Sequence, residues 1–184
     1  MPYAVPNPAT EGPQAGGAVR ERRASQAARR AREFEAFVAG AAGRLLHAAT
    51  LLTAEAPGDN PRARRLLTLS LAHTYACWDR LRGEDPYDRA RQHLATRFAR
   101  AAWHQYGGLG RARPHPTSPL AALTPQERLI VVLRLYEGVA EEQAAALLGL
   151  PADRVHTICD RATATLLHPP QGRAATSAMG VAPS

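Results

Sequence analysis

The fold of this chain is decided by residues 124–152, which read TPQERLIVVLRLYEGVAEEQAAALLGLPA. Thr124 and Glu127 have the spacing of a capping box, in which each side chain bonds the other residue's backbone N–H, so a helix is expected to begin here. Apolar residues follow, and Gly138 ends this helix. A second, shorter helix is predicted over 141–148, because the Gly-Leu-Pro that follows it forms a tight turn. The stretch therefore predicts two short helices and a turn.

A third helix is predicted after this turn, over residues 152–167, and it completes the spacing of a helix-turn-helix. On its inner side lie four apolar residues: Val155, Ile158, Ala162 and Leu166. On its outer side, near the helix end that enters a major groove in such motifs, lie polar residues: Arg154, His156, Thr157, Asp160 and Arg161. A plain helical hairpin with a glycine turn gives the same pattern, so the spacing alone leaves both interpretations open.

Three longer helices are predicted before this stretch. The first runs from about residue 20 to residue 55, since apolar residues between Phe34 and Leu52 recur on one helical stripe. The second begins at Pro61 behind an Asp-Asn cap and ends before Gly83. The third begins behind the cap residue Asp85 and continues to about residue 106. The expected fold class is all-α.

These helices divide into two small modules. Residues 20–106 are expected to form a three-helix domain, and residues 123–168 a helix-turn-helix domain. Between them, residues 107–122 contain three Gly and three Pro without apolar periodicity, which predicts a flexible linker. Residues 1–19 and 169–184 are rich in Pro, Gly, Ala and Ser, and we expect both to be disordered tails.

The charge of the chain is strongly basic. Its 184 residues carry a formal net charge of +7, with 23 Arg and no Lys. The segment 20–106 holds sixteen arginines against nine acidic residues, whereas 124–168 holds four against six. Such a charge favours acidic partners such as nucleic acid, although a merely soluble basic surface gives the same count. Because no Ser-His-Asp spacing or Gly-rich phosphate loop is present, we do not expect an enzyme.

The two cysteines, Cys77 and Cys159, are too few for a disulfide framework or a four-cysteine zinc site, which fits a reducing cytoplasm. His73 lies one helical turn before Cys77 and would begin a metal site, but a buried imidazole beside a buried thiol is the simpler interpretation. We therefore expect no metal and no cofactor. The most apolar window, 36–54, contains Arg44 and His47, so neither a membrane span nor a signal peptide is expected.

The order of these motifs resembles a known family. Leu-Thr-Pro-Gln-Glu-Arg at 123–128, Val-Val-Leu-Arg-Leu-Tyr-Glu-Gly at 131–138 and Ala-Ala-Leu-Leu-Gly-Leu-Pro at 145–151 are similar to the fourth region of extracytoplasmic-function sigma factors. Leu66-Leu67, Thr74-Tyr75, Trp78 and Asp85-Pro86 resemble the second region of the same family. The resemblance implies an alternative sigma factor that binds RNA polymerase core enzyme and promoter DNA in the cytoplasm. An anti-sigma factor is a further candidate partner.

The site residues follow from this resemblance. The polymerase-docking positions are Arg64, Arg65, Leu66, Leu67 and Thr68, where the family carries an acidic Glu-Asp-Leu-Val-Gln run, so the charge is reversed. Arg64 and Arg65, with Arg62 before them, either meet an acidic partner or phosphates, or form a solvated face. The expected DNA-binding residues are Arg154, His156, Thr157 and Arg161 in the second module, with Arg97, Arg100, Trp103 and His104 in the first. Trp103 is equally suited to stack on a base or to fill a core.

Two hypotheses of function remain open at this point. The first is a promoter-recognising sigma subunit, and it rests on the order of the two modules and the capped helix-turn-helix. The second is a sigma-like regulatory protein that has lost polymerase binding and acts by protein contact, and it rests on Arg64, Arg65 and the acidic second module.

Overall fold

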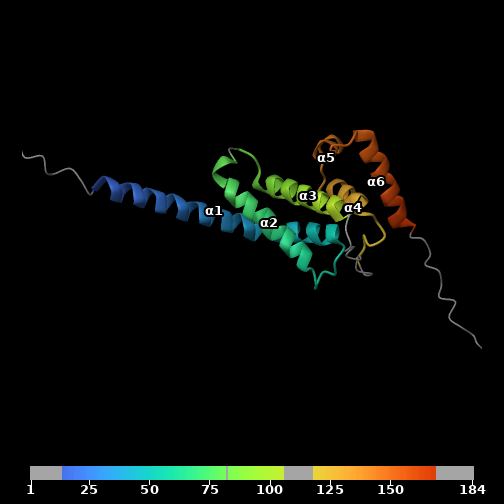
Figure 1. Cartoon of the computed structure of the whole chain (residues 1–184), viewed down its shortest axis with the longest axis horizontal. Helices are drawn as coiled ribbons and strands as arrows, with labels where there is room; N and C mark the ends of the chain where they lie inside the picture. The colour runs from blue at the N-terminus through green and yellow to red at the C-terminus, as the bar shows by residue number, and fades with distance from the viewer. Residues whose placement is uncertain (1–13, 82, 106–117, 169–184) are drawn as a thin grey trace, which may run out of the picture.

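The computed structural model describes residues 14–81, 83–105 and 118–168, and within these residues the protein is all-α, as predicted (Figure 1). The helices are α1 (Gln14–Thr53), α2 (Pro61–Cys77), the short 3₁₀ helix η1 (Trp78–Arg80), α3 (Pro86–Gln105), α4 (Pro125–Val131), the π-helical turn η2 (Val132–Tyr136), α5 (Glu141–Leu148) and α6 (Ala152–Leu167). The bounds of α5 and α6 agree with the prediction. α1 begins six residues earlier than predicted, and the expected linker lies mostly outside the described residues.

The second half of α1 packs against α2 and η1 through aromatic rings. The ring of Phe34 lies 4.8 Å from that of Tyr75 and 5.3 Å, edge-on, from that of Trp78. Phe37 adds a further contact with Trp78 at 5.5 Å. Each such pair contributes about 0.5–1.5 kcal/mol beyond the area that it buries. This cluster fixes where α1 joins the bundle.

The start of α2 differs from the prediction. Asn60 occupies the N-cap position, but its side chain makes no capping hydrogen bond. Instead, the buried carboxylate of Glu55 accepts from the backbone N–H of Ala63 at 2.8 Å and of Arg62 at 3.1 Å. Burial alone would raise the pKa of Glu55, but these bonds and the Arg62 guanidinium lower it. The acid that satisfies the helix dipole thus comes from the preceding loop rather than from the cap position.

The predicted helix from 125 to 136 is not regular throughout. The capping box of Thr124 and Glu127 is present at its start, as expected. At its end the chain widens into the π-helical turn η2, closed by the Glu137 N–H donating to the Val132 carbonyl at 2.9 Å. This turn leaves Leu135 60 % exposed, while Glu137 is buried.

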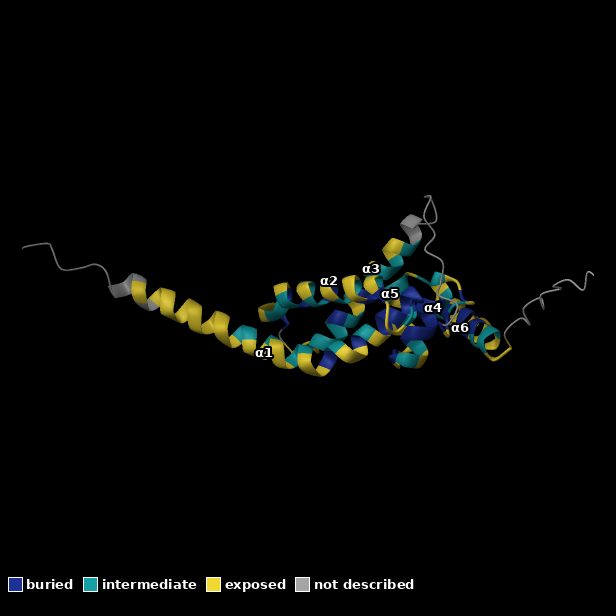
Figure 2. Ribbon diagram, turned by 90° about the horizontal axis from the view of Figure 1, so that it is seen from below, coloured by how far each residue is buried: buried dark blue, intermediate teal, exposed yellow. Residues whose placement is uncertain are grey.

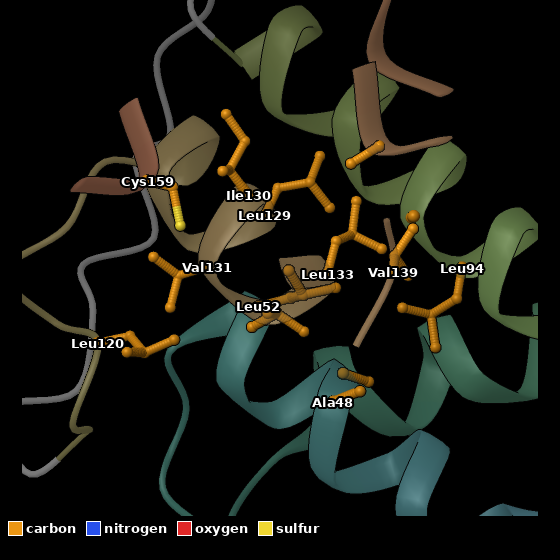
Figure 3. Close-up of a cluster of buried hydrophobic side chains, with 14 of the residues drawn as sticks. Ala48, Leu52, Leu94, Leu120, Leu129, Ile130, Val131, Leu133, Val139 and Cys159 are labelled. Atoms are coloured by element: carbon orange, nitrogen blue, oxygen red, sulfur yellow. The ribbon is translucent and has the colours of Figure 1, made fainter. Parts of the chain in front are cut away.

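One continuous core joins helices of both predicted modules (Figure 3). Leu45 and Leu52 of α1 lie fully buried in the same cluster as Ile130 and Leu133 of the α4–η2 segment. The buried Arg128 guanidinium also ties α4 to α1, because it donates to the Leu52 carbonyl at 2.9 Å. The helix-turn-helix is therefore mounted on the first three helices through apolar and polar contacts.

α1 is also long and apolar enough to cross a membrane over Val19–Thr53, with an 18-residue window of mean hydropathy 1.3. One such helix is weak evidence, because core helices of soluble proteins and signal sequences pass the same test. In this structure Ala41, Leu45 and Ala48 of that stretch are buried against the other helices.

Candidate nucleic-acid interface

The helix-turn-helix geometry is formed by α5 and α6. Gly149 ends α5 in the left-handed conformation, with a φ of 66°, which costs glycine little and other residues about 1 kcal/mol or more. The Leu150 N–H then donates to the Ala145 carbonyl at 3.0 Å, which satisfies the end of α5. α6 packs its buried Val155 and Ile158 toward the core. The turn therefore sets α6 with its polar side outward.

The outward face of α6 carries the predicted residues. Arg154, His156, Thr157 and Arg161 are all exposed. The Thr157 hydroxyl donates to the Asp153 carbonyl at 2.9 Å, so it stays close to the helix surface. The structure thus brings together all four residues that the sequence predicted for this helix.

Acidic side chains compete for two of these residues. Arg161 is paired with Glu127 at 2.9 Å. The two ring nitrogens of His156 face Glu141 and Asp160, each at 3.2 Å. These pairs weaken attraction to phosphate, because a cation already neutralised in the protein releases fewer counterions from DNA.

Glu127 shows how firmly the pair with Arg161 is held. Burial would raise the pKa of Glu127, but hydrogen bonds from the Thr124 backbone and hydroxyl and from Arg161 outweigh it and lower the pKa. Arg154, in contrast, has no ion pair within the described part of the chain. It is therefore the cation on α6 that is most available to an anionic partner.

In the first module, Arg97 and Arg100 are exposed on α3, as predicted. Burial, followed by electrostatic repulsion from His73, Arg97 and Arg100, lowers the pKa of His93 to about 4. The backbone of Trp103 and His104 belongs to α3, but their side chains lie outside the described residues.

The predicted docking positions on α2 present a mixed surface. Arg64, Arg65 and Thr68 are exposed, whereas Leu66 and Leu67 are half-buried and pack on the core. The Arg64 guanidinium donates to the Asn60 side-chain oxygen at 2.9 Å. Outward cations beside inward leucines form an amphipathic helix with a basic exposed face.

Arg62 precedes these positions, and the sequence left it open to the same interpretations as Arg64 and Arg65. The structure gives it an internal role, because it pairs with Glu55 at 3.0 Å and donates to the Thr53 carbonyl. The sequence analysis did not identify Glu55 as the partner of Arg62, because no helical periodicity connects an acid seven residues earlier with a helix start.

The candidate metal ligands lie near one another. The Sγ of Cys77 is 3.9 Å from the Nε2 of His73, and the His73 ring stacks on His93 with centroids 4.0 Å apart. Within the described residues, however, no group of three His, Cys, Asp or Glu side chains is placed to hold a metal ion.

Sequence reasoning missed the contacts that hold η2 against α1 and α3. The Tyr87 hydroxyl donates to both carboxylate oxygens of Glu137, at 2.9 and 3.0 Å. Arg44 lies 3.6 Å from the same carboxylate and donates to the Tyr136 carbonyl. No sequence signal marked Glu137, because an acid beside a glycine is normally exposed.

Comparison with known proteins agrees with this arrangement. Residues 120–167 match the model of the family described as Sigma-70, region 4, which covers all of α4, η2, α5 and α6. The chain is also 29 % identical over 153 residues to the RNA polymerase sigma-E factor of Streptomyces coelicolor, covering 73 % of this chain and 84 % of that protein. Over residues 120–167 the chain is thus similar to region 4 of sigma factors, and over most of its length it is similar to a sigma factor. No solved structure matches this chain. The similarity to the sigma-E factor extends into the first helices, since it covers 73 % of the chain and the region 4 match covers only residues 120–167.

Proposed function

We infer that this chain is an alternative sigma factor, which binds RNA polymerase core enzyme and directs it to promoters. The observation that carries this function is the capped helix-turn-helix of α4–α6, whose outward face remains exposed while its inner face is buried. The chain acts by binding, so the reaction chemistry belongs to the polymerase, and no bond is made or broken by the chain itself.

Each module has a distinct role in this proposal. The face of α6 with Arg154 and Thr157 contacts the upstream promoter element in the major groove, because both side chains are exposed near the N-terminal half of the helix. His156 and Arg161 contribute after exchanging their internal acidic partners for phosphate. On α3, the residues proposed to contact the downstream element are Arg97, Arg100, Trp103 and His104.

The polymerase-docking surface is proposed to be the exposed face of α2 at positions 64–68. Arg64 and Arg65 extend into solvent, and the Arg64 guanidinium donates to the neutral side-chain amide of Asn60. We propose that they meet an acidic surface of the polymerase. The half-buried Leu66 and Leu67 support the helix from within.

The place of action follows from these partners. Polymerase and chromosomal DNA lie in the bacterial cytoplasm, and the buried state of Cys77 and Cys159 as free thiols is compatible with a reducing compartment. An anti-sigma factor is a further proposed partner. The alternative function, a regulator without polymerase binding, has less support because the similarity includes both modules.

The experiment that tests this function is transcription from fragmented host DNA by the core enzyme, with and without the purified chain. Sequencing of the transcript 5′ ends is expected to reveal start sites that depend on the chain and share two upstream elements. An Arg154→Gln variant should weaken the use of these sites, whereas Arg154→Lys should retain more of it. An identical set of start sites with and without the chain would contradict the proposal.

A further inference from the structure

The first part of α1 extends away from the bundle without support from other helices (Figure 2). Every residue from Val19 to Arg29 is exposed. The helix first meets the bundle at Arg30, which pairs with Asp79 at 2.9 Å and lies over the Tyr75 ring. We call residues 19–32 the arginine arm.

The arm concentrates positive charge. Between Val19 and Glu33 the chain has six arginines and one glutamate, over about 20 Å of helix. Arg29 is paired with Glu33 at 2.7 Å and Arg30 with Asp79, but Arg20, Arg22 and Arg23 have no ion pair among the described residues. The end of the arm therefore carries cations without internal partners.

The arm lacks the residues that a protein or membrane contact requires. Between Arg20 and Glu33 the largest apolar side chain is Ala, so no aromatic or aliphatic anchor is available to fill a partner's pocket. A helix that lies on a membrane also needs bulky apolar residues opposite its charges. The remaining means of binding is the attraction of arginine to a polyanion.

The directions of the arginines favour a groove over a flat surface. At about 100° per residue, Arg20, Arg22 and Arg23 leave the helix axis at relative angles of about 0°, 200° and 300°. A flat anionic surface would meet Arg20 and Arg23, whose directions are about 60° apart, but not Arg22, which is about 160° from Arg20. The major groove of B-form DNA admits an α-helix with phosphates on both sides, whereas that of A-form RNA is too narrow.

We propose that the arginine arm is a third DNA-binding element, which contacts the phosphates of duplex DNA independently of α6 and α3. An unsupported helix of this length is marginally stable in water, so binding to DNA also stabilises its helical form. The contact is independent of base sequence and adds affinity for the duplex. It extends the proposed function, because it adds a DNA contact beyond those proposed for α3 and α6.

The test measures binding of the full chain to a fluorescently labelled 30-base-pair duplex without a promoter, by anisotropy between 50 and 200 mM salt. Replacing Arg20, Arg22 and Arg23 together by Gln should reduce the slope of log affinity against log salt by about 2.7, since each phosphate contact contributes about 0.9. Over this fourfold range of salt, the affinity of the natural chain should fall roughly 40-fold more than that of the variant.

Matched variants keep the test specific. The triple Lys variant retains the charges and should retain the slope, and Gln has nearly the helix propensity of Arg, so circular dichroism should show an unchanged fold. An unchanged slope in the Gln variant, or an equal loss in the Lys variant, would overturn the proposal. Loss of polymerase binding with an unchanged slope would also overturn it, by assigning the arm to a protein contact. Because the probe lacks a promoter and the assay lacks polymerase, failure here leaves the proposed sigma function standing.

Discussion

The contact between Tyr87 and Glu137 gives a quantitative test of how the helix-turn-helix is mounted on α3. The Glu137 side chain is only 1 % exposed, and the Tyr87 hydroxyl is its closest partner. Tyr87→Phe removes this donor but keeps the aromatic ring, so only the volume of the hydroxyl group is lost. Because a hydrogen bond to a charged group contributes about 1.5–3 kcal/mol, the free energy of unfolding should fall by about that amount.

Urea unfolding, followed by circular dichroism, measures the change, and Tyr136→Phe is the matched control. The Tyr136 hydroxyl has no hydrogen-bond partner among the described residues, so this control should change stability by less than about 0.5 kcal/mol. In a Glu137→Gln background, the cost of Tyr87→Phe should fall to about 0.5–1.5 kcal/mol, as for a neutral bond. Equal costs in both backgrounds, or a loss no larger than that of the control, would refute the reasoning.

The same contact predicts a dependence on pH. Burial and the adjacent Glu137 carboxylate raise the pKa of Tyr87 above its usual value near 10. Below pH 10 the hydroxyl is protonated in both states, and its contribution is complete. Above pH 10 only the unfolded chain loses the proton readily, so stability falls as pH rises. Tyr87→Phe should therefore lose stability less steeply between pH 9 and 11 than the natural chain.

Two further changes test other parts of the fold. Because the pKa of His93 is lowered to about 4 in the folded chain, against about 6.5 unfolded, stability should fall as pH decreases from 6.5 toward 4, and His93→Gln should flatten this part of the melting-temperature profile. A profile unchanged by His93→Gln would contradict the burial of the neutral imidazole. Thr124→Ala removes the acceptor of the capping box and should cost about 1 kcal/mol in urea unfolding, whereas Thr124→Ser should cost little. A loss in the Ser variant as large as in the Ala variant would show that the methyl group, not the hydroxyl, matters.

Local sequence signals predicted much of this fold because they depend on neighbouring residues. The capping box at Thr124 and the glycine at 149 placed the ends of α4 and α5, and the apolar spacing from Val155 placed the buried side of α6. The outward residues of α6 followed from the same period. These features depend on helix geometry, which is the same in every protein.

Contacts between distant residues could not be predicted in the same way. The buried carboxylates of Glu55 and Glu137 find their partners seven and fifty residues away, and no period connects such positions. The acidic partners of His156 and Arg161 also come partly from other helices. The docking role of the residues on α2 and the DNA-binding role of those on α3 and α6 stay predictions, since each role depends on contacts with a partner molecule.

The central claim is that this chain binds RNA polymerase core enzyme, and the most direct measurement is co-elution of the two on a sizing column at moderate salt. The core enzyme comes from the host of the chain, and an Arg64→Glu/Arg65→Asp variant is run beside the natural sequence. We predict that the natural chain co-elutes with the core and that the variant binds no better, because the arginines meet an acidic surface. Failure of the natural chain together with binding of the variant would contradict the account, since Arg64 and Arg65 would then have abolished docking.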